Sequence, residues 1–143
     1  MRVRKTAILA MTCLVLGGGT FQDQWNQQVR RYLSQAAYEI AEHPVRPSHN
    51  AMYGELNEGY YSQFTALLRA NHTYYITGRC DVDCGDLDLE LYNENWQFIK
   101  ADKTPDDQPY LQVTPTATRK FTIRVLMESC VEEPCRWGVG IFE

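Results

Sequence analysis

The stretch "CDVDCGDLDLELY", residues 80–92, decides the fold class because its second half alternates strictly in polarity. Every second residue from 87 to 91 is leucine, and the positions around the leucines carry carboxylates. Successive side chains of a β-strand point to opposite faces of the sheet, so this spacing predicts a strand with one buried apolar face. Three carboxylates are expected on the opposite, solvated face: Asp86, Asp88 and Glu90.

Six other segments have the same character. They are short, rich in Tyr, Thr, Val, Ile and Leu, and bounded by turn-forming residues: 60–68, 73–80, 97–102, 110–115, 119–127 and 136–142. Strands and helices do not alternate along this part of the chain, which disfavours a parallel sheet. Seven strands of this kind predict an all-β fold, an antiparallel jelly-roll-like β-sandwich.

One amphipathic α-helix is expected in front of the strands, over residues 23–42. Its apolar side chains recur at three- and four-residue intervals and therefore share one face: Trp25, Val29, Tyr32, Leu33, Ala36 and Ile40. Pro44 and Pro47 follow, and proline cannot continue a helix. This apolar stripe either docks on the β-domain or pairs with another chain, and docking is the favoured interpretation.

Residues 1–19 have the layout of a secretory signal peptide. Three basic residues precede an apolar run over 6–16, and the small residues Gly17 and Gly19 follow it. The run is shorter than the roughly 20 residues that a membrane-spanning helix needs. A lipoprotein with Cys13 as the lipidated residue is the disfavoured alternative. We therefore expect an exported protein, periplasmic or secreted, with no membrane span in the mature chain.

This prediction divides the chain into three parts: a signal peptide over 1–19, a helix and linker over 20–47, and a β-sandwich domain over 48–143. The leader holds three of the 14 basic residues and none of the 18 acids, so residues 20–143 carry 11 bases against 18 acids, a net charge of −7. Binding of nucleic acid normally requires a basic surface, so no nucleic-acid partner is expected.

Four cysteines follow the leader: Cys80, Cys84, Cys130 and Cys135. An even number in an exported chain favours disulfides, and four cysteines allow three pairings. Local pairing within "CDVDC" and within "CVEEPC" is favoured, although chain entropy alone would favour bridges between the two loops. A zinc site is disfavoured because the spacings are C-x3-C and C-x4-C in acidic loops. A thioredoxin-type redox site would need C-x-x-C.

Acidic residues concentrate between 81 and 107, where nine of the 18 acids fall. Calcium binds six to eight oxygen ligands, mostly from carboxylates and carbonyls, so two acidic loops make it the metal to consider. The alternative is that these aspartates cap turns through neighbouring backbone amides, as Asp commonly does. The two loops supply Asp81, Asp83 and Asp86 in the first and Asp102, Asp106 and Asp107 in the second as candidate ligands.

The ordered set of motifs over residues 55–143 resembles the bacterial pre-peptidase C-terminal domains and their free-standing relatives. These motifs are "YYI" at 74–76, "DLDLELY" at 86–92, "DKTPDDQP" at 102–109 and the final strand "WGVGIF" at 137–142. The resemblance implies an exported, jelly-roll-like domain that is not catalytic. Some domains of this family bind calcium or extracellular polymers. By this analogy the calcium-side residues are Asp81, Asp83, Asp86 and Asp88, with Asp102, Asp106 and Asp107 as further candidates.

The expected function is that of an exported, non-catalytic binding or accessory module, stabilised by calcium if the acidic loops bind it. Its partner would be an extracytoplasmic protein or polymer. One alternative is a structural or assembly protein of the cell envelope that contacts a partner through its N-terminal helix. A second alternative is a carboxylate-based hydrolase, which is suggested by the spacing of about 7 Å between Asp86, Asp88 and Glu90 on one strand face. It is disfavoured because the outward face of a half-buried strand commonly carries such residues.

Overall fold

The computed structural model describes residues 21–143, so the predicted signal peptide lies outside the described residues. Within this range the chain forms one helix followed by eight strands. Their bounds are α1 Phe21–Ala36, β1 Met52–Leu56, β2 Tyr61–Leu68, β3 Tyr74–Cys80, β4 Cys84–Asn93, β5 Phe98–Asp102, β6 Tyr110–Val113, β7 Arg119–Cys130 and β8 Cys135–Phe142. Among these residues no helix combines the length and apolar character needed to cross a bilayer.

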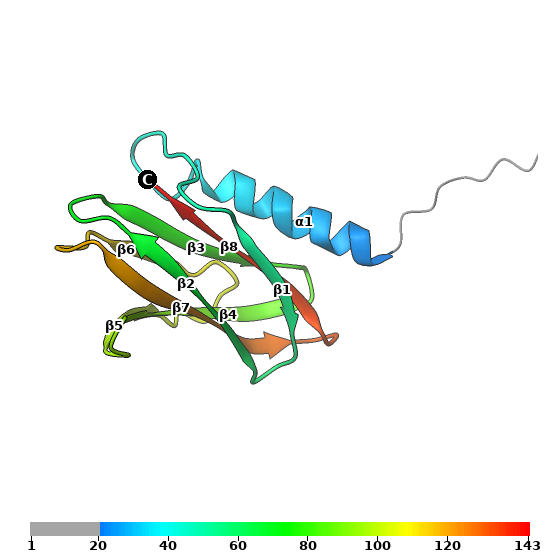
Figure 1. Cartoon of the computed structure of the whole chain (residues 1–143). Helices are drawn as coiled ribbons and strands as arrows, with labels where there is room; N and C mark the ends of the chain where they lie inside the picture. Colours follow the sequence, from blue (N-terminus) through cyan, green and yellow to red (C-terminus); the bar gives the residue numbers. More distant parts are fainter. Residues whose placement is uncertain (1–20) are drawn as a thin grey trace, which may run out of the picture.

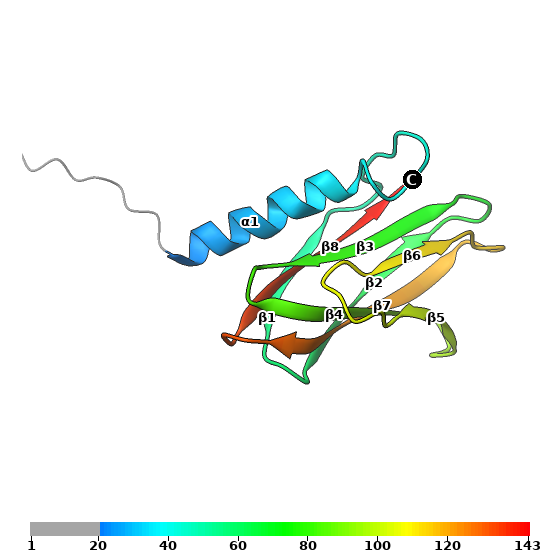
Figure 2. The same ribbon diagram turned by 180° about the vertical axis from the view of Figure 1, so that it is seen from behind.

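The strands form two four-stranded sheets, ordered β1-β8-β3-β6 and β2-β7-β4-β5. All strand pairs are antiparallel. This strand order is that of an eight-stranded jelly roll, in which each sheet alternates strands from the two halves of the chain. Figures 1 and 2 show the two sheets facing each other, with α1 along the outside of the sheet that contains β3 and β8. The predicted all-β sandwich with one N-terminal helix is therefore confirmed.

The core lies between the two sheets, and the leucines of β4 occupy its centre. Leu87, Leu89 and Leu91 are each 0 % exposed, as the alternation predicts. On the neighbouring strand β7 the same face carries Ile123 and Val125, which are opposite Leu91 and Leu89 in the strand register. From the other sheet, buried apolar side chains complete the core: Tyr74, Ile76, Leu111, Trp137, Val139 and Ile141.

Helix α1 covers the outer face of β3 and β8, so both faces of these two strands are buried. Val29, Leu33 and Ala36 of the predicted apolar stripe are at most 3 % exposed, which confirms the docking interpretation. Gly138 and Gly140 of β8 allow the close approach. A Cβ on Gly138 would lie 2.9 Å from Val29, and one on Gly140 would lie 3.4 Å from Leu33.

The part of the chain before β2 differs from the prediction in two respects. Strand β1 (Met52–Leu56) is not among the seven predicted strands; it is short, contains Gly54, and pairs at the sheet edge with β8. The helix ends at Ala36 and not at residue 42. Beyond Ala36 the backbone tightens into turns, with the amide of Glu39 donating to the carbonyl of Ala36 at 3.0 Å.

The docked helix gives a first prediction. Replacing Leu33 by alanine removes apolar contacts from a side chain that is 3 % exposed, and should lower the free energy of unfolding by about 2–4 kcal/mol. Urea denaturation measures the change. Gln27→Ala, at an exposed position of the same helix, is the control and should change stability by no more than about 0.5 kcal/mol. Equal effects of the two substitutions would contradict the docking of α1.

Candidate functional site

The four cysteines form two local disulfides, Cys80–Cys84 and Cys130–Cys135, which is the pairing that sequence analysis favoured. The Cα atoms of each pair are 5.9 Å apart, within the usual range for a disulfide. Each bridge closes a loop of five or six residues, and the chain entropy that it removes from the unfolded state stabilises the fold by about 2 kcal/mol. All four cysteines belong to strands, so β4, β7 and β8 are longer at this end than the sequence predicted.

Three loops lie together at this end of the sandwich: 57–60, 81–83 and 131–134. We call them the disulfide end. The amide of Val131 donates to the carbonyl of Asp83 at 2.8 Å, which joins the two disulfide loops. The Glu58 carboxylate accepts from the amide of Cys130 at 3.0 Å, and the amide of Glu58 donates to the Glu133 carboxylate at 2.7 Å. The loops are therefore held in one arrangement by covalent and hydrogen bonds.

Two of the predicted outward carboxylates are not solvated. Asp88 is 4 % exposed and Glu90 is 7 % exposed, because β4 is an inner strand whose outer face is crowded by longer side chains from its neighbours. Glu90 has three partners: Lys103 Nζ at 2.7 Å, the Tyr92 hydroxyl at 2.6 Å and Arg124 Nη1 at 3.5 Å. Burial by itself would raise the pKa of Glu90, but the hydrogen bonds from Lys103 and Tyr92 outweigh it and hold the pKa below its usual value.

Asp88 differs from Glu90 in having no such set of partners. Its Oδ1 is buried and, among the described residues, accepts no hydrogen bond. Burial, together with the nearby carboxylates of Asp86 and Glu128, raises the pKa of Asp88 to about 6. On this face Glu90 is thus paired with two cations, whereas Asp88 is buried with one oxygen unpaired among the described residues.

The candidate calcium ligands do not converge on one point. Asp102 accepts hydrogen bonds from the amides of Thr104 and Tyr110, at 3.0 and 2.8 Å, and Asp106 accepts from the amide of Gln108 at 2.8 Å. These are the turn-capping roles that sequence analysis gave as the alternative. In the part of the chain that the structure describes, no group of three or more His, Cys, Asp or Glu side chains is arranged to hold a metal ion.

Asp81, in the first acidic loop, is a buried connector. It is 2 % exposed, and its Oδ2 accepts a hydrogen bond from the amide of Arg136 at 2.8 Å. Its other oxygen, Oδ1, is buried without a partner among the described residues. Burial raises the pKa of Asp81. Asp83, Asp86 and Asp107, the three remaining candidates, are half-buried.

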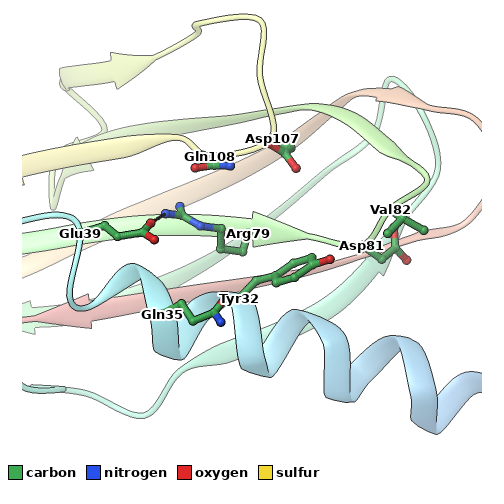
Figure 3. Close-up of a pocket in the computed structure, with 8 residues that line it drawn as sticks. All are labelled: Tyr32, Gln35, Glu39, Arg79, Asp81, Val82, Asp107 and Gln108. Atoms are coloured by element: carbon green, nitrogen blue, oxygen red, sulfur yellow. Dashed lines mark ion pairs between the residues drawn. The ribbon is translucent and has the colours of Figure 1, made fainter.

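A cleft of about 320 Å³ opens between the C-terminal half of α1 and the sheet that contains β3, beside the 81–83 loop. Figure 3 shows Tyr32 and Gln35 reaching it from the helix, with Asp107 and Gln108 on the side of the loop between β5 and β6. We call it the Arg79 cleft. Its lining residues are Tyr32, Gln35, Glu39, Arg79, Asp81, Val82, Asp107 and Gln108.

Arg79 forms the floor of this cleft and is 7 % exposed. Its Nη1 donates to the Thr77 hydroxyl and to the Gly78 carbonyl, both at 2.7 Å. Its Nη2 lies 3.6 Å from a carboxylate oxygen of Glu39, a side chain that is itself 65 % exposed. A guanidinium has five N–H donors, and the two hydrogen bonds of Arg79 among the described residues both leave from Nη1. Burial lowers the pKa of Arg79, and the field of Glu39 opposes the shift.

Sequence reasoning did not single out Arg79. The one signal was a charged residue inside a segment predicted to be a strand, at a position that shares a face with Tyr75 and Thr77. Because α1 docks over this face, a charge that would otherwise be solvated becomes the polar centre of a cleft.

The nearest approach to a nucleophile and base is the pair Ser48 and His49. The Ser48 hydroxyl lies 2.9 Å from His49 Nδ1, and His49 Nε2 lies 3.0 Å from the carbonyl of Leu67. The same hydroxyl is 3.1 Å from the carbonyl of Ile141. Backbone carbonyls, and not a carboxylate, hold these side chains, so the pair ties the 47–50 segment to β2 and β8.

No protein-family model matches the chain, and a comparison with curated proteins finds no match. Among solved structures, the chain is similar to PliG of Aeromonas hydrophila, a periplasmic inhibitor of g-type lysozyme. The two are 17 % identical, and the match covers 64 % of this chain and 84 % of that one with a TM-score of 0.43. A likeness at this level supports no statement about function.

The burial of Asp88 gives a prediction with a definite sign. An unfolded Asp carboxyl ionises near pH 4, whereas the folded one ionises at about pH 6. Between these values the folded state binds more protons, so Asp88 lowers stability progressively as the pH rises from about 4 to about 6. Asp88→Asn should therefore raise the free energy of unfolding at pH 7, by on the order of 2 kcal/mol, with a gain that shrinks towards zero near pH 4. Urea denaturation across this range measures it.

The control for this prediction is Glu132→Gln, which removes one negative charge from an exposed position. Its effect should be small and nearly independent of pH over the same range. A constant difference between Asp88→Asn and the unmodified protein from pH 4 to 7 would show that Asp88 is ionised normally in the folded state.

Proposed function

We propose that this protein is an exported, non-catalytic binding module and that its ligand-contacting region is the Arg79 cleft. The observation that carries the proposal is the convergence of polar side chains in one concave site with a buried guanidinium at its floor. Binding sites are typically concave, with a few polar groups that fix the orientation of the ligand. The volume of about 320 Å³ lies at the lower end of the range for such sites.

The lining of the cleft suits a ligand that both donates and accepts hydrogen bonds, such as a peptide segment. Arg79, Gln35 and Gln108 supply N–H donors, and Glu39 and Asp107 supply acceptors. Glu39 is exposed and only loosely paired with Arg79, at 3.6 Å, so it can turn away when a ligand approaches. The partner is therefore proposed to be an extracytoplasmic protein or a polymer that presents such groups.

Export is supported by the chemistry of the cysteines. Disulfides persist in oxidising compartments outside the cytoplasm, and each of the two bridges closes one short loop of this sandwich. The membership of the chain in the pre-peptidase C-terminal family stays a prediction from its motifs. The alternative of an envelope assembly protein with a free helix face is less well supported, because the apolar stripe of α1 packs on the chain's own sheet.

Filling the cleft tests the proposal. Gln35→Trp places an indole in the cleft, and Gln27→Trp places one at an exposed position of the same helix that does not line it. Each immobilised protein is exposed to envelope extract and to purified extracellular polymers, and what it retains is identified by mass spectrometry or sugar analysis. We expect the unmodified protein and Gln27→Trp to retain the same partner, and Gln35→Trp to bind it at least about tenfold more weakly.

Two results would count against this function. Retention of one partner with equal affinity by both tryptophan variants would remove the Arg79 cleft as the contact region. If nothing is retained beyond what a heat-denatured sample retains, the binding-module proposal fails as a whole.

Calcium stabilisation also stays a prediction, now with a specific test. A ligand that binds only the folded state raises the unfolding midpoint in proportion to RT ln(1 + [L]/Kd). If the acidic loops bind calcium, millimolar calcium should raise the midpoint above its value in chelator, and Asp83→Asn should reduce the rise while Glu42→Gln should not. An identical midpoint in calcium and in chelator would remove calcium from the account.

A further inference from the structure

Apolar side chains are exposed at the tips of all three loops of the disulfide end. Val131 is 81 % exposed, Tyr60 is 65 % exposed and Val82 is 59 % exposed. Each of the two valines belongs to a loop closed by its own disulfide. The loops of these valines are joined directly by the hydrogen bond from the Val131 amide to the Asp83 carbonyl. These apolar side chains are thus carried on loops whose backbone is held by disulfides and hydrogen bonds.

The charge of the sandwich is strongly polarised along its length. At the disulfide end, segments 55–60, 81–86 and 128–136 contain eight acids and one base. At the opposite end, segments 40–50, 67–73, 93–97, 114–120 and 141–143 contain four bases and three acids. Such an asymmetry orients an approaching charged protein and raises its rate of association. The end that carries the exposed valines is therefore the end that attracts a basic surface.

We propose that the disulfide end is a docking surface for a basic protein, and that Val82, Val131 and Tyr60 insert into a concave, partly apolar site on that partner. This inference deepens the proposed function and rests on it. Exposed aliphatic and aromatic side chains gain free energy when they enter a partner's pocket. Because disulfides and hydrogen bonds already fix the loops, little conformational entropy is lost on binding.

The Arg79 cleft and the disulfide end adjoin each other through one loop. Val82 belongs to the 81–83 loop and also lines the cleft. A partner seated on the loop tips can therefore place a polar segment in the cleft, with the carboxylates of Glu39 and Asp107 facing a basic surface. A single partner of this chemistry accounts for the cleft, the apolar tips and the acidic end together.

The experiment compares two triple variants, each of which replaces one exposed tyrosine and two exposed aliphatic side chains by serine. The tip variant carries Tyr60→Ser, Val82→Ser and Val131→Ser. The control variant carries Tyr38→Ser, Leu67→Ser and Ile99→Ser, at positions that are exposed but distant in the fold. Circular dichroism and thermal unfolding establish that both are folded. The purified proteins are exposed to envelope extract, the retained protein is identified and purified, and its Kd is measured at low and at high salt.

We expect the retained protein to be basic, its Kd to rise with salt, and the tip variant to bind it at least about tenfold more weakly. The control variant should bind within about twofold of the unmodified protein. Equal binding by the tip and control variants, or an acidic or non-protein partner, would overturn this inference. If Gln35→Trp abolishes the same interaction while the tip variant does not, the proposed function stands and only the docking surface is wrong. If no specific partner is retained at all, both fail.

Discussion

The burial of the leucine row of β4 between the two sheets is the constraint on which the rest of this structure depends. It fixes β4 as an inner strand with one apolar face in the core. Because side chains alternate, the same placement forces Asp88 and Glu90 onto a single outer face where neighbouring strands crowd them. Glu90 is stabilised there by Lys103, Tyr92 and Arg124. Asp88 is left without a hydrogen-bond partner for Oδ1 among the described residues, and its raised pKa is the electrostatic cost of the register.

The other sheet, which contains β3 and β8, would have its outer face exposed to solvent if α1 did not cover it. The helix covers β3 and β8, and the glycines of β8 let it approach closely enough to bury Val29 and Leu33. The cover is incomplete at its C-terminal end, where the helix stops at Ala36 and the chain turns away. The Arg79 cleft runs along the side of the helix, from Glu39 just beyond this point to the 81–83 loop. The guanidinium of Arg79 is buried beneath the helix, but its Nη2 lies 3.6 Å from the exposed carboxylate of Glu39.

The sequence predicts most of this fold because the signals are local. Alternation at residues 87–91 places β4, and the three- and four-residue spacing of the apolar stripe places α1. Strand β1 was missed because its sequence, "MYGEL", has no alternation that stands out from a Pro-rich segment, and its pairing with β8 is a long-range event. The burial of Asp88, Glu90 and Arg79 could not be predicted for the same reason: it depends on which strand or helix lies across the face. The sequence predicts the capping of turns by Asp102 and Asp106 only as an alternative to metal binding. The hydrogen bonds from the amides of Thr104 and Gln108 to these carboxylates depend on the folded backbone, which the sequence alone does not give.

Local pairing of the cysteines has a physical consequence for what the disulfide end can do. Bridges between the two loops would remove more chain entropy from the unfolded state and so stabilise the fold by roughly 4 kcal/mol, against about 2 for a local bridge. They would also tie the strand ends together. The strand ends are already joined without them, since Cys84 and Cys130 are partners in the β4–β7 register and Val131 bonds to Asp83. Local bridges instead restrict each loop separately. Val131, in the loop closed by the Cys130–Cys135 bridge, is 81 % exposed. An apolar side chain held in water in this way is available for the docking contact that we propose for the disulfide end.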